Sequence, residues 1–309
     1  MKVYNSINSL PTFKNAVITI GSFDGVHRGH QMILDVMKKQ ADEVGGESVL
    51  ITFYPHPRMV IEPNVKFEVL STNNEKINYL SQFGLMNMVV IPFDNSFAEM
   101  SAEEYIEHFI CKNFSPHTII LGYDHRFGKG REGNIDSFRK FQDQYGYEIL
   151  EIEAATIDEI TISSTKIRNA LKSGDIQKAN DLLGYKYSIE GLVVLGKQIG
   201  RTIGFPTANI VVEEEQKLIP QNGVYLIEIL LDNFTHQGLL NIGTRPTVGG
   251  TTRSIEAYIL NFDRDIYGKK IKISLLQRIR DEKRFENIDL LKHQLLKDRE
   301  YAIDYFSKG

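Results

Sequence analysis

The chain has 309 residues, 42% hydrophobic and 25% charged, which is the composition of a globular protein and the length of roughly two domains. The net charge of −4 argues against a broad nucleic-acid surface, and the single cysteine, Cys111, excludes an internal disulfide and a cysteine-rich zinc site. Because we find neither a secretory leader nor an apolar run of about 18 residues, we expect a cytoplasmic protein that binds no membrane and no nucleic acid.

Apolar runs alternate with amphipathic segments in the first half of the chain. The runs predict strands over residues 16–20, 48–53, 88–91, 118–121 and 148–152. Between them, helical spacing of the apolar residues predicts helices over residues 30–43, 74–83, 102–112 and 135–145. This alternation predicts an α/β domain whose parallel sheet is covered by helices on both faces.

A glycine-rich turn joins the first predicted strand to the first predicted helix; His27 lies in this turn and His30 in the first turn of the helix. Backbone N–H groups and the positive end of a helix make such a turn suitable for an anion. The two histidines would face the same anion and could stabilise the charge that develops in phosphoryl or nucleotidyl transfer. A metal site is the alternative, but the sequence offers no third ligand nearby. The strand, turn and helix together favour a phosphate site.

Polar clusters also follow three of the other predicted strands, at residues 54–58, 92–94 and 122–131. Ligands of open parallel sheets bind beyond the carboxyl ends of the strands, so these clusters predict one shared site. The last cluster is not a P-loop, because its glycines are wrongly spaced and Gly130 stands where the magnesium-binding hydroxyl belongs. Its basic residues either line an anionic ligand or form a solvated loop.

The segment 163–168 begins a short predicted helix with serines and a threonine, which are common helix N-caps. Arg168 stands one turn into that helix, at the end that attracts anions. Alone this segment is a weak signal, but beside the histidine pair it indicates contacts with the outer phosphates of a nucleotide.

The second half of the chain is rich in predicted strands separated by turn residues. They cover residues 188–194, 209–212, 223–231, 238–241, 254–260 and 270–276, and they predict a small closed antiparallel β-barrel. Apolar residues from Ile288 onward predict a terminal amphipathic helix. We place the boundary so that the domains span residues 1–184 and 185–309.

Thr207 and Asn209 provide a hydroxyl and an amide oxygen close together, which are hard ligands suited to Mg²⁺ carried by a nucleotide. Glu256 stands in an otherwise apolar predicted strand. A carboxylate in a strand usually lies on the wet face. Glu256 would be a general base only if it pointed toward Thr207 and Asn209.

These motifs resemble those of the bacterial bifunctional riboflavin kinase/FAD synthetase family over essentially the whole chain. The matching segments are residues 21–30, 55–58, 162–168, 204–209, 241–247, 267–269 and 280–285. The resemblance implies an N-terminal Rossmann-like nucleotidyltransferase of the HxGH superfamily that adenylylates FMN to FAD. It also implies a C-terminal six-stranded barrel that phosphorylates riboflavin to FMN, with ATP and Mg²⁺.

The resemblance also implies a role for individual residues. Those that would contact ATP in the adenylyltransferase are Gly21, Ser22, Phe23, Asp24, His27, His30, Ser163, Ser164, Thr165 and Arg168. Those that would contact FMN are Phe53, His56, Pro57, Arg58 and Asp124. Those of the kinase site are Gly196, Gly200, Arg201, Gly204, Pro206, Thr207, Asn209 and Glu256. Catalysis would fall to His27, His30, Arg168 and Glu256, and Mg²⁺ to Thr207 and Asn209.

Three other interpretations remain open from the sequence. The chain could be an FAD synthetase whose barrel is inactive or regulatory, or a nucleotidyltransferase with another phosphorylated acceptor. It could also be a flavin-binding sensor without turnover. Flavins and ATP are the partners expected for the leading interpretation, and the sequence leaves the oligomeric state open, with a monomer as one option.

Overall fold

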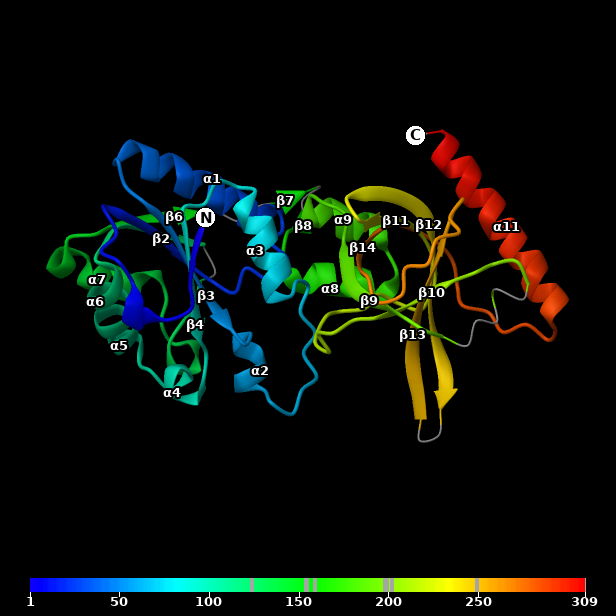
Figure 1. The fold of residues 1–309 in the computed structure, drawn as a ribbon. Helices are drawn as coiled ribbons and strands as arrows, with labels where there is room; N and C mark the ends of the chain where they lie inside the picture. The colour runs from blue at the N-terminus through cyan, green and yellow to red at the C-terminus, as the bar shows by residue number, and fades with distance from the viewer. Residues whose placement is uncertain are drawn as a thin grey trace. The chain divides into compact units, whose positions relative to one another are not determined.

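The structure is a computed structural model (Figure 1), and it describes residues 1–122, 125–152, 156–157, 160–196, 200, 203–247 and 250–308. The chain divides into two compact units, Met1–Ser164 and Thr165–Gly309. The second unit begins before the predicted domain boundary because it includes α8 (Ser164–Ser173) apart from its first residue, and α9 (Ile176–Leu183).

The first unit is built on a six-stranded sheet in which all paired neighbours are parallel. In spatial order its strands are β1 (Lys2–Tyr4), β4 (Asn87–Pro92), β3 (Ser48–Tyr54), β2 (Ala16–Ile20), β5 (Pro116–Gly122) and β6 (Glu148–Ile152). The α/β prediction is therefore confirmed. The main helices are α1 (Arg28–Glu43), α3 (Asn73–Ser81), a π-helix η2 (Tyr105–Cys111) between α5 (Ala102–Glu104) and α6 (Lys112–Phe114), and α7 (Ile135–Tyr145).

Helices cover both faces of this sheet, because alternate residues of each strand point to opposite sides. Ile18 packs in a buried cluster with Phe109 of η2 and Phe138 of α7. Its neighbour Val17 packs instead in a second cluster with Met37 of α1. Strands buried on both faces read as continuous apolar runs, and this is why the runs predicted them well.

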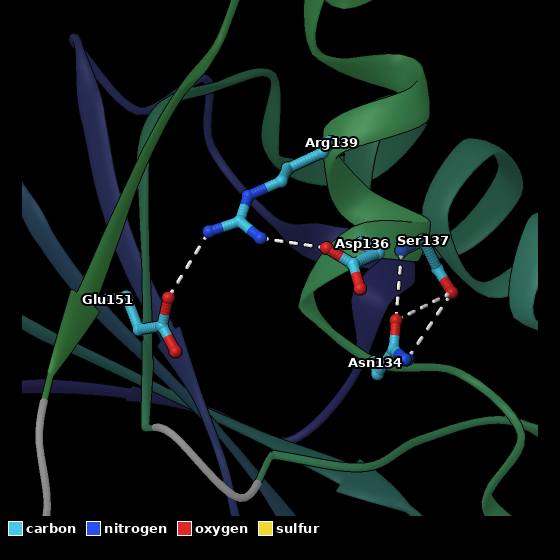
Figure 2. Close-up of polar contacts among 5 residues, drawn as sticks. All are labelled: Asn134, Asp136, Ser137, Arg139 and Glu151. Carbon is cyan, nitrogen blue, oxygen red and sulfur yellow. Dashed lines mark hydrogen bonds and ion pairs between the residues drawn. The ribbon is translucent and has the colours of Figure 1, made fainter.

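Short elements complete the first unit. They are the 3₁₀-helices η1 (Ile7–Ser9) and η3 (Lys129–Arg131), the helices α2 (Pro57–Ile61) and α4 (Asn95–Ala98), and the paired strands β7 (Thr156–Ile157) and β8 (Ile160–Thr161). Figure 2 shows how α7 is fixed at its start. Asn134 and Ser137 form a reciprocal cap, and Arg139 bridges Asp136 (2.7 Å) and Glu151 of β6 (3.2 Å).

The second unit is a closed antiparallel barrel, as predicted. Its strands lie in the order β10 (Ala208–Val211), β13 (Gly250–Ile259), β12 (Phe234–Thr247), β11 (Gly223–Leu231), β14 (Lys270–Arg280) and β9 (Ser188–Val194). The terminal helix α11 (Ile288–Ser307) packs through Ala302 against apolar residues of the barrel. No helix among the described ranges is long and apolar enough to cross a membrane.

A buried ion pair joins the barrel to α11. The guanidinium of Arg280 on β14 donates to both carboxylate oxygens of Asp298, at 2.6 to 3.0 Å. The side chains are only 16% and 5% exposed, so water screens this pair weakly. Gln294 donates a further hydrogen bond to the same carboxylate at 2.8 Å.

Replacing Asp298 by asparagine is expected to lower the free energy of unfolding of the barrel by about 3 kcal/mol, because the Arg280 charge stays buried without its counter-charge. Urea unfolding measures the loss. Glu213→Gln is the matched control in the same unit, since its ion pair with Lys270 is exposed to solvent and contributes little to stability. Equal effects of the two substitutions would contradict a structural role for the buried pair.

Candidate functional site

The turn between β2 and α1 has an unusual backbone. Phe23, Gly25 and Val26 have φ angles of 46°, 81° and 35°, which lie in the left-handed region. That region is costly for a β-branched residue such as Val26, so the surroundings must hold the turn in place. Such strain is frequent where a backbone is shaped to receive a ligand.

Asp24 is the anchor of this turn. Its side chain is buried, and its carboxylate accepts hydrogen bonds from the backbone N–H groups of Leu70 (2.9 Å) and Ser71 (3.0 Å). The Ser71 hydroxyl in turn accepts from the N–H of Gly25 at 3.0 Å, and the Ser164 hydroxyl donates to the carbonyl of Asp24 at 3.0 Å. Asp24 and Ser164 were predicted to contact ATP. This geometry gives both a role in shaping the turn.

His27 caps the N-terminus of α1. Its Nδ1 accepts a long hydrogen bond from the N–H of His30 at 3.4 Å, so the neutral ring carries its proton on Nε2. The two imidazole rings are stacked with centroids 3.7 Å apart, and His30 also stacks on Phe23 at 4.5 Å. The predicted histidine pair therefore forms one stacked unit at the carboxyl end of β2.

Burial holds the pKa of His30 well below its usual value, and repulsion from the protonated forms of His27 and Lys76 lowers it further. His30 is therefore a neutral imidazole at neutral pH. Within the described part of the chain, its Nδ1 is buried without a hydrogen-bond partner. A neutral imidazole can donate a hydrogen bond to a phosphate oxygen without carrying a full charge of its own.

Lys76 on α3 is a member of this site that the sequence did not predict. Its ammonium donates to the Ser22 carbonyl of the turn at 2.6 Å and to the Thr52 hydroxyl of β3 at 3.3 Å. A signal was present, because Lys76 stands four residues before Leu80 and so shares the buried face of the helix.

Three of the residues predicted for FMN, namely His56, Pro57 and Arg58, follow β3. They lie next to the turn of residues 21–27 between β2 and α1, here called the histidine turn. His56 caps α2, with its Nδ1 accepting from the N–H of Arg58 at 3.2 Å. The Arg58 guanidinium lies 5.5 Å from the ring centroid of Phe67 and pairs with Glu62 at 3.1 Å. The Gly21 N–H donates to the carbonyl of Ile51 at 3.0 Å, which ties the turn to β3. The clusters after β2 and β3 are thus neighbours on one sheet edge.

The remaining residues predicted for the adenylyltransferase site lie in different parts of the structure. Phe53 is 9% exposed and packs on Phe93 with ring centroids 5.5 Å apart, as part of the core. Pro57 is the first residue of α2, and Ser163 precedes α8 directly. Thr165 and Arg168 belong to the second unit, so their roles toward the histidines stay predictions. Asp124 lies outside the described residues.

In the barrel, strand pairing brings the predicted kinase residues together. Glu256 of β13 is paired with Asn209 of β10 on one side and with Asn241 of β12 on the other. Paired residues point to the same face of a sheet, so these three side chains form a lateral row, here called the polar row. The Thr207 hydroxyl donates to the Glu256 carboxylate at 3.3 Å. This set of hydroxyl, amide and carboxylate oxygens has the chemistry that Mg²⁺ prefers.

A cavity of about 300 Å³ adjoins the polar row. Its lining includes Thr207 and the pair Ala208 and Ala257, which are the chain neighbours of Asn209 and Glu256. Because successive strand residues alternate in direction, the cavity and the polar row lie on opposite faces of these strands. Thr207 borders both. The remaining lining residues are Val193, Pro206, Ile259, Phe262, Asp263, Arg264, Asp265, Ile266 and Tyr267.

The predicted glycines of the barrel have local reasons to be glycine. A Cβ on Gly196 would lie 2.1 Å from the side-chain amide of Asn209, and one on Gly200 would lie 2.2 Å from the carbonyl of Phe205. Gly204 has a φ of 83°, which other residues rarely adopt. These glycines let the loop approach the polar row closely. Arg201 lies outside the described residues.

Known proteins resemble this chain over its whole length. The family model described as FAD synthetase matches residues 10–166, and the model described as riboflavin kinase matches residues 183–306. Proteins named "Bifunctional riboflavin kinase/FMN adenylyltransferase" are among the relatives. The one from Escherichia coli (strain K12) is 35% identical over 99% of this chain and 98% of its own. The one from Bacillus subtilis (strain 168) is 36% identical over 94% and 93%.

A solved structure also has the same fold. It is a crystal structure from Streptococcus pneumoniae with a TM-score of 0.89 and 29% identity, covering 97% of this chain and 98% of the other. It is described as that of a macrolide-efflux protein. We take from it only the likeness of fold, since the description concerns the other protein.

Proposed function

The chain belongs to the bifunctional riboflavin kinase/FMN adenylyltransferase family, and from that premise we propose which residues carry each of its two reactions. It is an enzyme of FMN and FAD biosynthesis: one domain is an FAD synthetase and the other a riboflavin kinase. We keep residues 1–184 and 185–309 as the proposed domain limits. A cytoplasmic location is part of the same proposal.

In adenylyl transfer, a phosphate oxygen of FMN attacks the α-phosphorus of ATP and pyrophosphate leaves. His27 and His30 donate hydrogen bonds to the phosphate chain and stabilise the charge of the transition state. The stacking of the buried His27 ring on His30 at the N-terminus of α1 is the observation that carries this assignment. His56 and Arg58, on the adjacent strand end, bind the flavin phosphate, and Arg168 contacts the nucleotide.

In the kinase reaction, the 5′-hydroxyl of riboflavin attacks the γ-phosphorus of ATP and ADP leaves. Glu256 accepts the proton of that hydroxyl, and its carboxylate is oriented by the hydrogen bond from Thr207. Thr207 and Asn209 would hold Mg²⁺, which when bound neutralises charge on the phosphates of ATP. Asn241 lies in the same polar row and is placed to orient the same groups.

The whole proposal is tested by incubating the protein with riboflavin, ATP and Mg²⁺ and separating the flavins by chromatography. FMN is expected first and FAD later, because the product of the kinase is the substrate of the adenylyltransferase. Supplying FMN directly should yield FAD and pyrophosphate without the first step. No FAD from FMN would refute the adenylyltransferase. FAD without phosphorylation of riboflavin would refute the kinase and favour a regulatory barrel.

A further inference from the structure

Lys76 is a buried charged side chain that the proposed chemistry leaves without a function. It is only 6% exposed, yet its ammonium donates a hydrogen bond to the Ser22 carbonyl of the histidine turn. Burying a charge is costly unless it is paired, and an apolar side chain of similar length would fill the same space at less cost. Selection for folding alone would therefore not favour a lysine at this position.

The contacts of Lys76 form a closed triangle. Its Nζ lies 2.6 Å from the Ser22 carbonyl and 3.3 Å from the Thr52 hydroxyl, and that hydroxyl donates to the same carbonyl at 3.2 Å. Ser22 is the second residue of the turn, so α3 and β3 both hold the turn through one carbonyl oxygen. A rigid tether of this kind fixes where the following histidines stand.

Several charged or titratable groups surround this ammonium. The Asp24 carboxylate of the turn attracts it, and the ammonium in turn lowers the pKa of the His30 imidazole. Glu75, its neighbour on α3, accepts a hydrogen bond from the Thr72 N–H at 2.8 Å as part of a helix cap. Burial outweighs the attraction of Asp24, and the pKa of Lys76 falls to about 8.

We propose that Lys76 is a positioning residue for adenylyl transfer: its ammonium tethers the turn at Ser22 and provides a buried positive charge that draws the phosphates of ATP to His27 and His30. The inference rests on the proposed assignment of adenylyl transfer to this turn. Lys76 acts through the turn and through its electric field, and it gives up no proton to the substrate.

The direction of the pH effect follows from the lowered pKa. Lys76 is charged below about pH 8 and neutral above it, so its assistance is present at neutral pH and lost as the pH rises through that value. Arginine keeps its charge over this whole range. Methionine has none at any pH, and without the lysine charge the pKa of His30 should rise, since Lys76 contributes to its lowering.

The experiment compares Lys76→Met and Lys76→Arg with the unmodified enzyme, measuring kcat/KM for ATP with saturating FMN from about pH 6 to about pH 9.5. At neutral pH we expect kcat/KM of Lys76→Met to be about 10- to 100-fold lower, the order of loss found when a residue that orients the functional groups of a site is removed. The decline of the unmodified enzyme near pH 8 should be absent from Lys76→Met and shifted upward in Lys76→Arg. NMR titration of His30 should show a raised pKa in Lys76→Met.

Two controls separate this role from a general loss of structure. Riboflavin phosphorylation should be unchanged in every variant, and Lys39→Met, at an exposed lysine, should leave both reactions unchanged. The inference is overturned if Lys76→Met keeps the pH profile and kcat/KM of the unmodified enzyme, or if the pKa of His30 does not move. If the unmodified enzyme makes no FAD from FMN, the proposed function itself fails and the inference falls with it.

Discussion

Replacing His30 by alanine is expected to lower kcat/KM for the conversion of FMN to FAD by about 10²- to 10⁴-fold, while riboflavin phosphorylation stays unchanged. The variant loses the imidazole that stacks on His27 and stands neutral at the start of α1. No other described side chain occupies that position. Pyrophosphate release with FMN and ATP as substrates measures the effect, and ADP release with riboflavin measures the kinase.

Alanine also leaves a gap against Phe23, so a second variant must separate chemistry from packing. His30→Asn keeps a polar group of smaller size and should remain far below the unmodified enzyme even where it folds normally. His108→Ala is the matched control, because that histidine is exposed on η2 and takes no part in the site. If His30→Ala and His108→Ala had the same kcat/KM for the conversion of FMN to FAD, the histidine turn would not be the adenylylation site.

Replacing Glu256 by glutamine is expected to do the reverse, lowering kcat for riboflavin phosphorylation by about 10²- to 10⁴-fold and sparing the formation of FAD from FMN. Glutamine retains the shape of the side chain and can still accept from Thr207, but it cannot take the proton of the ribityl hydroxyl. The loss should therefore fall on kcat more than on the KM for ATP. Steady-state assays of ADP release separate the two constants.

Glu190→Gln is the matched control for this substitution. It lies on β9 of the same barrel and is exposed, so its loss of charge should leave the kinase unchanged. An unaffected kcat in Glu256→Gln would mean that the polar row orients substrates without accepting a proton. A loss of both reactions in a normally folded variant would argue against separate sites.

The sequence predicted the fold where burial dictates the pattern. Apolar runs identified five of the six strands of the sheet, the four central strands and the edge strand β6, and β2 and β6 have the predicted limits. The edge strand β1 was not predicted, because three residues that are partly exposed carry no recognisable period. The strands β12 and β13 are longer than predicted, because their hairpin continues beyond the apolar stretch that the prediction relied on.

The site was predicted as a set of residues but not as a set of contacts. Strand ends and glycines indicated where His27 and His30 stand, since local sequence determines the turn and the helix start. Asp24 accepts hydrogen bonds from the backbone of Leu70 and Ser71, which lie 46 and 47 residues further along the chain. Lys76 reaches the turn in the same way, across 54 residues. Such long-range pairings leave no periodic signal in one sequence.

The opposite faces of β13 have a consequence for how this protein can change in length. Side chains alternate between the two faces of β13, so Glu256 points to the polar row and its neighbour Ala257 to the cavity. Gaining or losing one residue within the strand would exchange them, whereas a change of two residues would restore the order. In this strand, insertions and deletions of an even number of residues therefore preserve the two faces, and those of an odd number do not. An odd insertion that the fold tolerates would silence the kinase while every residue of the motif was still present.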